Sequence, residues 1–490
     1  MATAEVGTRR AGRGAHGRAR PSPAQRWRQR AAVRLARVDA TTVASLFVLL
    51  LFLVPSRLVV RPVGGTGTPA NLLALGALLW WATARLVPGL GGARGRQPVR
   101  AGLAPLVLVV LASYTYAMLR GWTIELNLHQ RSDVFANLVP PTLDQRAALQ
   151  VSAADRGLLS LAAWAGITVL VADGVRRRAD LDRLLRRLVL AASVMASLGI
   201  MQYFTGVDIA GAFRIPGLSV NGEFGAVGQR SVVRRVAATA IHPIEFGVVL
   251  AAVLPLALHY ALHAPPARRR AAWLQAGLVG AALPMAVSRS GILALLVLVP
   301  AWPARWRWRA LLFAPFLAVG MRLAAPGLLG TIRSLFTNLA NDPSAQGRTA
   351  DFGPVLRLVA ESPWLGRGFF TFMPRLYRTL DDQYLLILVE LGVLGFLALL
   401  VFFGAAVGAA RGARRRSGEP ATRHLGQALA AAVAALAVSY ATFDALGFPM
   451  AASLTFLLVG CCGALWRQVA GEAPAAGTAS DARLTTGHFR

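Results

Sequence analysis

Charged and reactive side chains are scarce in this chain. Asp, Glu, Lys and Arg make up only 15% of its 490 residues, and every basic residue is arginine. The absence of lysine excludes chemistry through a lysine Schiff base. Its two cysteines, Cys461 and Cys462, are adjacent in an apolar stretch, which provides neither a disulfide framework nor the spacing of a metal site. We expect both to be small packing residues.

Hydrophobic residues are abundant instead, at 55% of the chain, and the mean hydropathy is +0.52. A soluble protein rarely buries so much apolar surface, whereas a polytopic membrane protein exposes it to lipid. The net charge of +30 therefore indicates membrane topology before it indicates nucleic acid, and we expect no nucleic-acid partner.

The sequence predicts an all-α polytopic membrane protein with about twelve spans, because apolar runs of about 17–25 residues can cross the hydrocarbon core. The predicted spans are 41–60, 70–88, 102–119, 157–173, 184–204, 243–262, 272–287, 289–302, 308–324, 383–410, 425–445 and 448–466. They form a membrane domain over residues 39–468. An arginine-rich arm, 1–38, and a tail, 469–490, are predicted to be disordered, with the arm on anionic lipid.

Arginine placement predicts the orientation. If the N-terminus is cytoplasmic, arginine-rich segments such as "RRRADLDRLLRR" (176–187) and "RGARRRSGEPATRH" (411–424) are cytoplasmic too, as the positive-inside rule requires. We therefore expect a multi-pass protein of the cytoplasmic membrane with both termini cytoplasmic. Three long connections, 120–156, 205–242 and 325–382, would then be extracytoplasmic. The last contains a predicted helix, "GPVLRLVAES", and a tight loop, "SPWLGRGFF".

Polar residues gather on the expected outer side, and each has a structural explanation as well as a functional one. His242 precedes a helix-starting proline, Ser288 fits a helix cap, and Arg289 can reach lipid phosphates. Arg348 fits a solvated loop, and Glu390, within a span, should face the bundle interior.

Two adjacent acids, Asp381 and Asp382, head the span that follows the last long loop. Helix capping explains one of them but not both. Arginines near the membrane surface suit a ligand with phosphate groups, and a carboxylate beside them suits deprotonation of a hydroxyl. No metal-binding spacing appears among the outer residues, so we expect no metal or other cofactor. These residues predict a metal-independent, outer-face transferase that acts on a lipid-linked diphosphate.

The stretches "HPIEFG", "SRSGILAL", "ESPWLGRGFF" and "DDQYLLILVELGVLG" resemble the bacterial O-antigen ligase and O-antigen polymerase superfamily over about residues 195–410. The ligases of that family show His, then Asn, Ser or Gln, nine residues, Gly, two residues and Gly. This chain reproduces the spacing with Asp381, Asp382, Gly392 and Gly395. An acid in place of the histidine is typical of polymerase-type relatives.

The resemblance implies a glycosyltransferase with the GT-C-like fold of lipid-linked sugar transferases. Its donor would be a glycan on a polyprenyl diphosphate, usually undecaprenyl, and an acceptor hydroxyl would attack with inversion. Arg289 and Arg348 match the family's diphosphate-binding arginines, and Asp381 matches the position of the base. Arg234, Arg235 and His242 match more loosely. Asp382 would position the acceptor or cap the helix, and Ser288 and Glu390 would support substrate binding.

Several alternatives stay open. A polymerase joins repeat units on the lipid carrier, whereas a ligase moves the finished glycan to another hydroxyl acceptor. A lipid or polysaccharide transporter would place its ionisable residues near the membrane midplane, where only Glu390 is expected. A scaffold within an envelope polysaccharide-synthesis complex is the fourth reading.

Overall fold

The computed structural model describes residues 39–86, 97–121, 142–221, 235–298, 319, 322, 327–337, 343–374 and 376–472. Its helices are α2 (Ala40–Leu53), α3 (Pro69–Leu86), α4 (Pro98–Arg120), α5 (Leu143–Gly174), α6 (Arg178–Thr205), α7 (Ile209–Ala212), α8 (Pro243–Leu262), α9 (Pro266–Ala282), α10 (Arg289–Leu298), α12 (Leu328–Thr337), α13 (Pro343–Glu361), α14 (Gln383–Arg416), α15 (Pro420–Ser439) and α16 (Pro449–Glu472). Short 3₁₀ turns are η1 (Arg61–Gly67), η4 (Leu283–Ala286) and η7 (Tyr440–Thr442). Two two-residue strands, β1 (Leu58–Val59) and β2 (Ser219–Val220), pair antiparallel. The all-α class is confirmed.

Seven of the described helices are long and apolar enough to cross a membrane, namely α4, α5, α6, α8, α14, α15 and α16. Each corresponds to a predicted span. At the other five predicted spans, α2 has 14 residues, α3 has 18, α9 has 17 and α10 is described only to Leu298, while 308–324 lies almost wholly outside the described residues. The protein is a multi-pass membrane protein, and the total of twelve spans stays a prediction.

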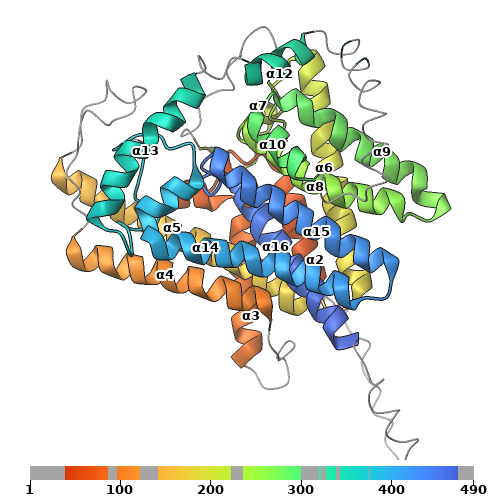
Figure 1. Cartoon of the computed structure of the whole chain (residues 1–490), viewed down its shortest axis with the longest axis horizontal. Coiled ribbons are helices and arrows are strands. Elements are labelled where there is room, and N and C mark those ends of the chain that lie inside the picture. Colours follow the sequence, from red (N-terminus) through yellow and green to blue (C-terminus); the bar gives the residue numbers. More distant parts are fainter. Residues whose placement is uncertain are drawn as a thin grey trace, which may run out of the picture. The chain divides into compact units, whose positions relative to one another are not determined.

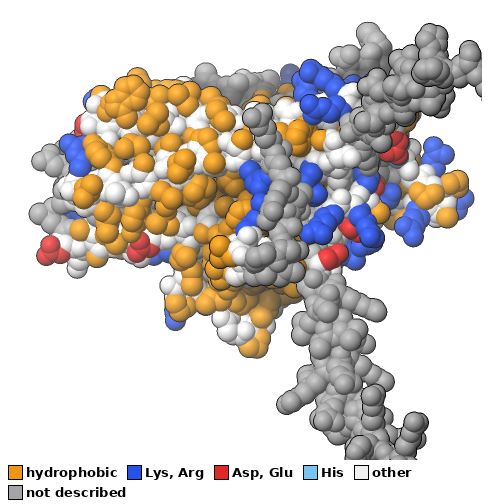
Figure 2. Space-filling view, turned by 90° about the horizontal axis from the view of Figure 1, so that it is seen from below, with side chains coloured by type: hydrophobic (Ala, Val, Ile, Leu, Met, Phe, Trp, Pro, Cys, Tyr) orange, Lys and Arg blue, Asp and Glu red, His pale blue; other side chains and the backbone are white. Residues whose placement is uncertain are grey.

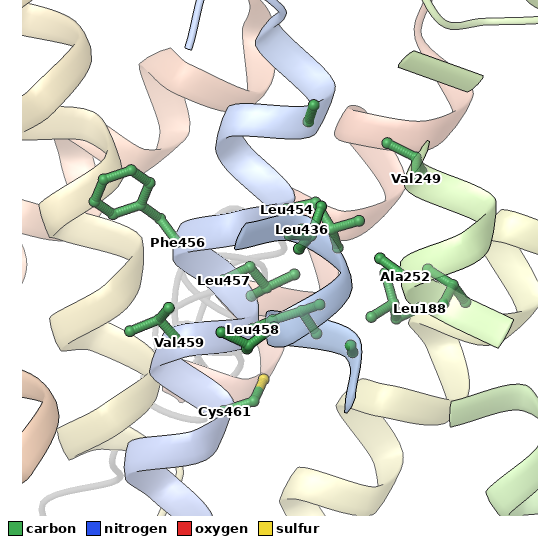
Figure 3. Close-up of a cluster of buried hydrophobic side chains, with 14 of the residues drawn as sticks. Leu188, Val249, Ala252, Leu436, Leu454, Phe456, Leu457, Leu458, Val459 and Cys461 are labelled. Carbon is green, nitrogen blue, oxygen red and sulfur yellow. The ribbon is translucent and has the colours of Figure 1, made fainter. Parts of the chain in front are cut away.

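The core of the membrane domain forms around α16, the most buried of the seven helices. Leu454, Leu457 and Leu458 of α16 meet Leu436 of α15 and Val249 of α8 in a layer of fully buried aliphatic side chains (Figure 3). Cys461 and Cys462 are buried and unbridged in the same cluster. The prediction that they are packing residues is confirmed.

Other helices keep apolar side chains on the surface. Leu108 and Leu119 of α4 are 64% and 82% exposed, and Leu79 of α3 is 69% exposed. Figure 2 shows a broad apolar surface with arginine and acidic side chains toward its margins. Lipid contact explains an exposed apolar surface of this extent.

The predicted outer connections contain more helix than expected. Residues 143–156 belong to α5, because Thr142 caps that helix in a capping box with Gln145. The connection 325–382 contains α12 and α13, and the predicted helix at 353–362 is the second half of α13, which runs beside α14 (Figure 1). The arm 1–38 and the tail after 472 lie outside the described residues.

Candidate active site

The start of α14 separates the two adjacent aspartates. Asp382 is the N-cap residue, and its Oδ1 accepts hydrogen bonds from the backbone N–H groups of Tyr384 (2.8 Å) and Leu385 (3.1 Å). The capping role predicted for one of the acids is therefore confirmed for Asp382. Asp381 lies one residue earlier and is half-buried. Because Asp382 accepts both capping hydrogen bonds, the cap does not require the carboxylate of Asp381.

Asp381 lies close enough to two further acids to affect their ionisation. Burial raises the pKa of Asp351 on α13 above its usual value, and the charge of Asp381 raises it further. Desolvation raises the pKa of Asp444, in the α15–α16 connection, well above its usual value, and Asp381 again adds to the shift. Asp381 therefore interacts electrostatically with acids of two other segments, and we refer to Asp351, Asp381 and Asp444 as the acidic cluster.

Arginines of two segments reach the same cluster. Arg378 forms a 2.7 Å ion pair with the buried Asp351, and Arg378 and Arg348 both counteract the rise in its pKa. Arg348 also lowers the pKa of Asp382, although burial dominates and the net shift is upward. The Nη2 of Arg348 donates to the Thr442 carbonyl at 2.8 Å, while its Nε and the Nε of Arg378 are buried without a hydrogen-bond partner. Unsatisfied buried guanidinium donors are suited to an anionic ligand.

The helix α14, which begins at the cluster, is interrupted along its length. Gly392 has φ 66° and ψ −166°, which interrupts the helix nine residues after its start. The N–H groups of Val393 and Leu394 donate to the carbonyls of Pro363 (2.8 Å) and Trp364 (3.3 Å). In return, the carbonyls of Val389 and Glu390 accept from the N–H groups of Arg367 (3.1 Å) and Gly368 (2.9 Å). The loop 363–368 thus replaces helical hydrogen bonds that the break removes.

Glycine is required on both sides of this contact. A Cβ on Gly392 would lie 2.4 Å from the backbone of Trp364, and a Cβ on Gly366 would lie 2.3 Å from the backbone of Glu390. The tight loop predicted from "SPWLGRGFF" is confirmed. The first glycine of the "DD…G…G" spacing therefore has a backbone role, which the spacing alone did not reveal.

Glu390 is buried at this break and faces the protein interior, as predicted. Its carboxylate accepts a hydrogen bond from the N–H of Phe372 at 3.1 Å, and its backbone carbonyl also accepts from the Ser113 hydroxyl of α4 at 3.1 Å. These contacts connect α14 to the 363–373 loop and to α4. They favour the structural explanation of Glu390 over a place in the substrate site.

The start of α8 borders the cluster from another side. His242 is the N-cap residue of α8, and its Nδ1 accepts from the N–H of Ile244 at 3.2 Å. The buried carboxylate of Glu245 accepts from the N–H groups of Met450 (2.7 Å) and Ala451 (3.0 Å), at the start of α16. Glu245 also adds to the raised pKa of Asp444, so the start of α8 lies close to the acidic cluster.

Ser288 and Arg289 lie where α10 begins. The Ser288 hydroxyl accepts weakly from the N–H of Gly291 (3.5 Å), in agreement with the predicted cap. Arg289 is half-buried, and Arg235 donates to the Ala286 carbonyl at 3.4 Å, so both arginines lie at the η4–α10 junction. This junction packs on α8, because a Cβ on Gly291 would lie 3.2 Å from the backbone of Gly247.

The structure thus groups the predicted site residues into two neighbouring sets. Arg348, Asp381 and Asp382 form the first, and His242, Ser288, Arg289 and Arg235 form the second, connected to the first through α8 and the 443–448 connection. Arg234 lies outside the described residues. Sequence reasoning missed Asp351, Arg378, Asp444 and Glu245 as members of the site. Asp351 lies three residues after Arg348 in the polar stretch "GRTADFGP", so it could have been found.

Three histidines lie close together at the end of α8 and near the start of α15, away from both sets. The sequence predicted no metal ligands, yet one ligand atom from each of His259, His263 and His424 lies within 4.8 Å of the others. His259 and His263 are four residues apart on a helix, a spacing that could have indicated a shared face.

Comparison with known families bears on residues of both sets. The family model described as O-antigen ligase matches residues 274–400, which include α10, α13, the loop 363–368 and the first half of α14. This region belongs to the O-antigen ligase family. No curated protein matches the chain.

The O-antigen ligase region holds Arg289, Arg348, Asp351, Arg378 and both aspartates, whereas His242 and Asp444 come from outside it. The resemblance inferred from the sequence is confirmed. The protein is accordingly a membrane enzyme of polysaccharide assembly. The family match implies a polyprenyl-linked glycan as the general class of donor.

Proposed function

We propose that this enzyme is a metal-independent glycosyltransferase that polymerises repeat units of a surface polysaccharide at the extracytoplasmic face of the cytoplasmic membrane. The proposal rests on the different positions of the two aspartates at the start of α14. Asp382 caps the helix, so the half-buried Asp381, beside Asp351 and Asp444, is left to act as a base.

In the proposed reaction, an acceptor hydroxyl attacks the anomeric carbon of the donor glycan. Asp381 accepts the hydroxyl proton, a new glycosidic bond forms, and the bond from the anomeric carbon to the diphosphate oxygen breaks with inversion. The electron pair leaves with the polyprenyl diphosphate. Because a diphosphate is a good leaving group, electrostatic stabilisation contributes more than a general acid does.

Arg348 is suited to that stabilisation, because the Thr442 carbonyl holds one end of its guanidinium while its Nε has no partner. Arg378, held by Asp351, supplies a second oriented guanidinium beside it. Arg289 would bind the diphosphate from the η4–α10 junction, as the family resemblance implies. We propose no cofactor, because these guanidinium groups can neutralise the leaving group where other enzymes use Mg²⁺.

A glycan ligase is the second candidate, and the matching family model carries that description. Both activities use the same bond changes and differ only in the acceptor. The acid at Asp381, where ligases have histidine, favours the polymerase. A transporter would depend on Glu390, but the hydrogen bonds of that residue to Phe372 and to the break favour a structural role.

Reconstitution tests the proposal. The purified protein is placed in liposomes with a lipid-linked single repeat unit from its host, and the products are resolved by size. We expect a ladder of longer lipid-linked glycans. Asp381→Asn should reduce its formation by at least about 100-fold, since general base catalysis contributes that much. Arg348→Ala and Arg289→Ala should also lose the ladder.

Arg357→Ala is the matched control, because Arg357 lies exposed on the same helix as Arg348. It should leave the ladder unchanged. A normal ladder from Asp381→Asn would contradict the assignment of the base. If the folded wild-type protein made no ladder but transferred the glycan to a separate acceptor, the ligase reading would replace the polymerase.

A further inference from the structure

Three imidazole rings meet at the end of α8 that lies farthest from the candidate active site. His259 and His263 come from the last turn of α8 and its C-cap position, and His424 is the fifth residue of α15. The Nδ1 atoms of His259 and His424 are 3.0 Å apart, and the ring of His263 lies 4.8 Å from each of the other two. The proposed transferase reaction uses none of these residues.

The hydrogen bonding of His263 prepares it for ligation. Its Nδ1 lies 3.0 Å from the carbonyl of His259, one turn earlier. A ring nitrogen that donates to a carbonyl leaves the other nitrogen, Nε2, unprotonated and correctly oriented as a ligand. Metal-bound histidines in proteins show this arrangement in almost every case.

The geometry fits one ion with small side-chain rotations. Zinc binds histidine nitrogen at about 2.0–2.1 Å, so two imidazole nitrogens on a tetrahedral ion lie about 3.3 Å apart. The observed separations, from 3.0 Å to at most 4.8 Å, bracket that value. His259 is buried and His424 half-buried, whereas His263 is exposed and gives an ion access from the surface.

Three arginines lie near the three rings. Arg178 pairs with Asp182 at 2.5 Å, and the same carboxylate accepts from the Tyr260 hydroxyl at 2.8 Å. Arg186 lies over the Tyr260 ring, 4.4 Å from its centre, and Arg414 donates to Gln427. These arginines therefore have partners of their own next to the three rings.

We propose that His259, His263 and His424 form a binding site for a divalent transition-metal ion of the Zn²⁺ type. Three imidazoles from two helices provide the ligands that zinc, copper and nickel accept, and a water would complete the shell. His259 lies fourteen residues after Glu245 on the same helix, about 20 Å along its axis. The ion would fasten the end of α8 to the start of α15, far from the reacting groups.

Metal binding to the full-length protein tests the site. The protein is purified in detergent with a tag that contains no histidine, freed of metal, and titrated with Zn²⁺ alone. We expect one tightly bound ion per chain. In the double variant His263→Ala/His424→Ala, binding should weaken by at least about 100-fold, because even the loss of an outer-shell partner costs 10–100-fold.

Two single variants serve as controls. Tyr260→Phe removes a neighbouring hydroxyl but no ligand, and it should bind Zn²⁺ as the wild type does. His263→Cys replaces one ligand with a thiolate, so it should retain binding, and with Co²⁺ it should add a sulfur-to-metal charge-transfer absorption. Thermal unfolding without metal shows whether each variant is folded. Equal Zn²⁺ binding by the wild type and a folded double variant would overturn the proposal, as would a Co²⁺ complex of His263→Cys without the sulfur band.

Discussion

At the residue scale, the acids near α14 differ in the partners that hold them. Asp382 is bound by two backbone N–H groups and Asp351 by Arg378, whereas Asp444 lies near two other acids, Asp381 and Glu245. Desolvation and these like charges favour the protonated form of Asp444. Its ionisation should therefore oppose folding.

The stability of Asp444→Asn should respond to pH differently from that of the wild type. The folded-state pKa of Asp444 is raised, so the wild type loses stability as pH rises from the unfolded pKa toward the folded one, at about 1.4 kcal/mol per pH unit. Asparagine cannot ionise and removes this loss. The difference in unfolding midpoint, variant minus wild type, should increase in thermal unfolding experiments as the pH rises above about 4, the ordinary pKa of an aspartate.

Asp144→Asn, in the exposed first turn of α5, removes the same charge and is the control. Its midpoint relative to the wild type should not rise with pH. A constant difference for Asp444→Asn over the same range would mean that Asp444 is not held protonated by its surroundings.

At the element scale, α14 is two helical segments joined at Gly392. The four backbone hydrogen bonds to the 363–368 loop replace the bonds that a continuous helix would have there. The loop thus fixes the angle at which the upper segment, with its aspartates, meets the rest of α14. Glu390 adds one side-chain bond to the same junction.

Replacing Gly392 by alanine should cause a large loss of stability. The new Cβ would lie 2.4 Å from the backbone of Trp364, at a positive φ that costs alanine about 1 kcal/mol or more. We expect a lower unfolding midpoint and loss of transferase activity, measured by thermal unfolding in detergent and by the reconstitution assay.

Gly404→Ala tests the same substitution in the same helix, where nothing lies within 4 Å of the added Cβ. Alanine there should stabilise the helix by about 0.5–1 kcal/mol. If Gly392→Ala and Gly404→Ala changed the unfolding midpoint alike, the break at Gly392 would not hold the loop 363–368 against α14.

Much of this element was predictable from the sequence, and part of it was not. Local patterns predicted the span, the cap at one aspartate and the tight loop, because each depends on neighbouring residues. The docking of the loop against Gly392 and the approach of Asp444 and Asp351 to Asp381 depend on segments far apart in the chain. The short connection "FDALGFP" gave no local indication that Asp444 would join the site.

At the scale of the whole molecule, the apolar surface and the uneven distribution of arginine describe a protein oriented in a bilayer. The ends of α14 differ sharply, since acids precede it and Arg414, Arg415 and Arg416 end it. The positive-inside rule favours a cytoplasmic location for the arginine end. The candidate active site would then face the opposite side.

Single cysteines at the two ends of α14 test this orientation, in a background with Cys461 and Cys462 replaced by alanine. Thr379 and Gly418 are both exposed, so Thr379→Cys and Gly418→Cys form a matched pair. A membrane-impermeant maleimide should label Thr379→Cys in right-side-out vesicles and Gly418→Cys only in inverted vesicles. The reverse pattern would place the candidate site in the cytoplasm.

The break at Gly392 also affects how this span can assemble. Gly392 lies about 14 Å along the helix axis from the start of α14, about half the thickness of the hydrocarbon core. With the start of α14 at the membrane surface, the loop 363–368 would be a re-entrant segment, whose peptide groups bond to those of α14 within the hydrocarbon core. Insertion alone would leave these groups unsatisfied. We infer that α14 reaches its final form only after the preceding loop has followed it into the membrane, so that insertion and tertiary folding are one coupled event.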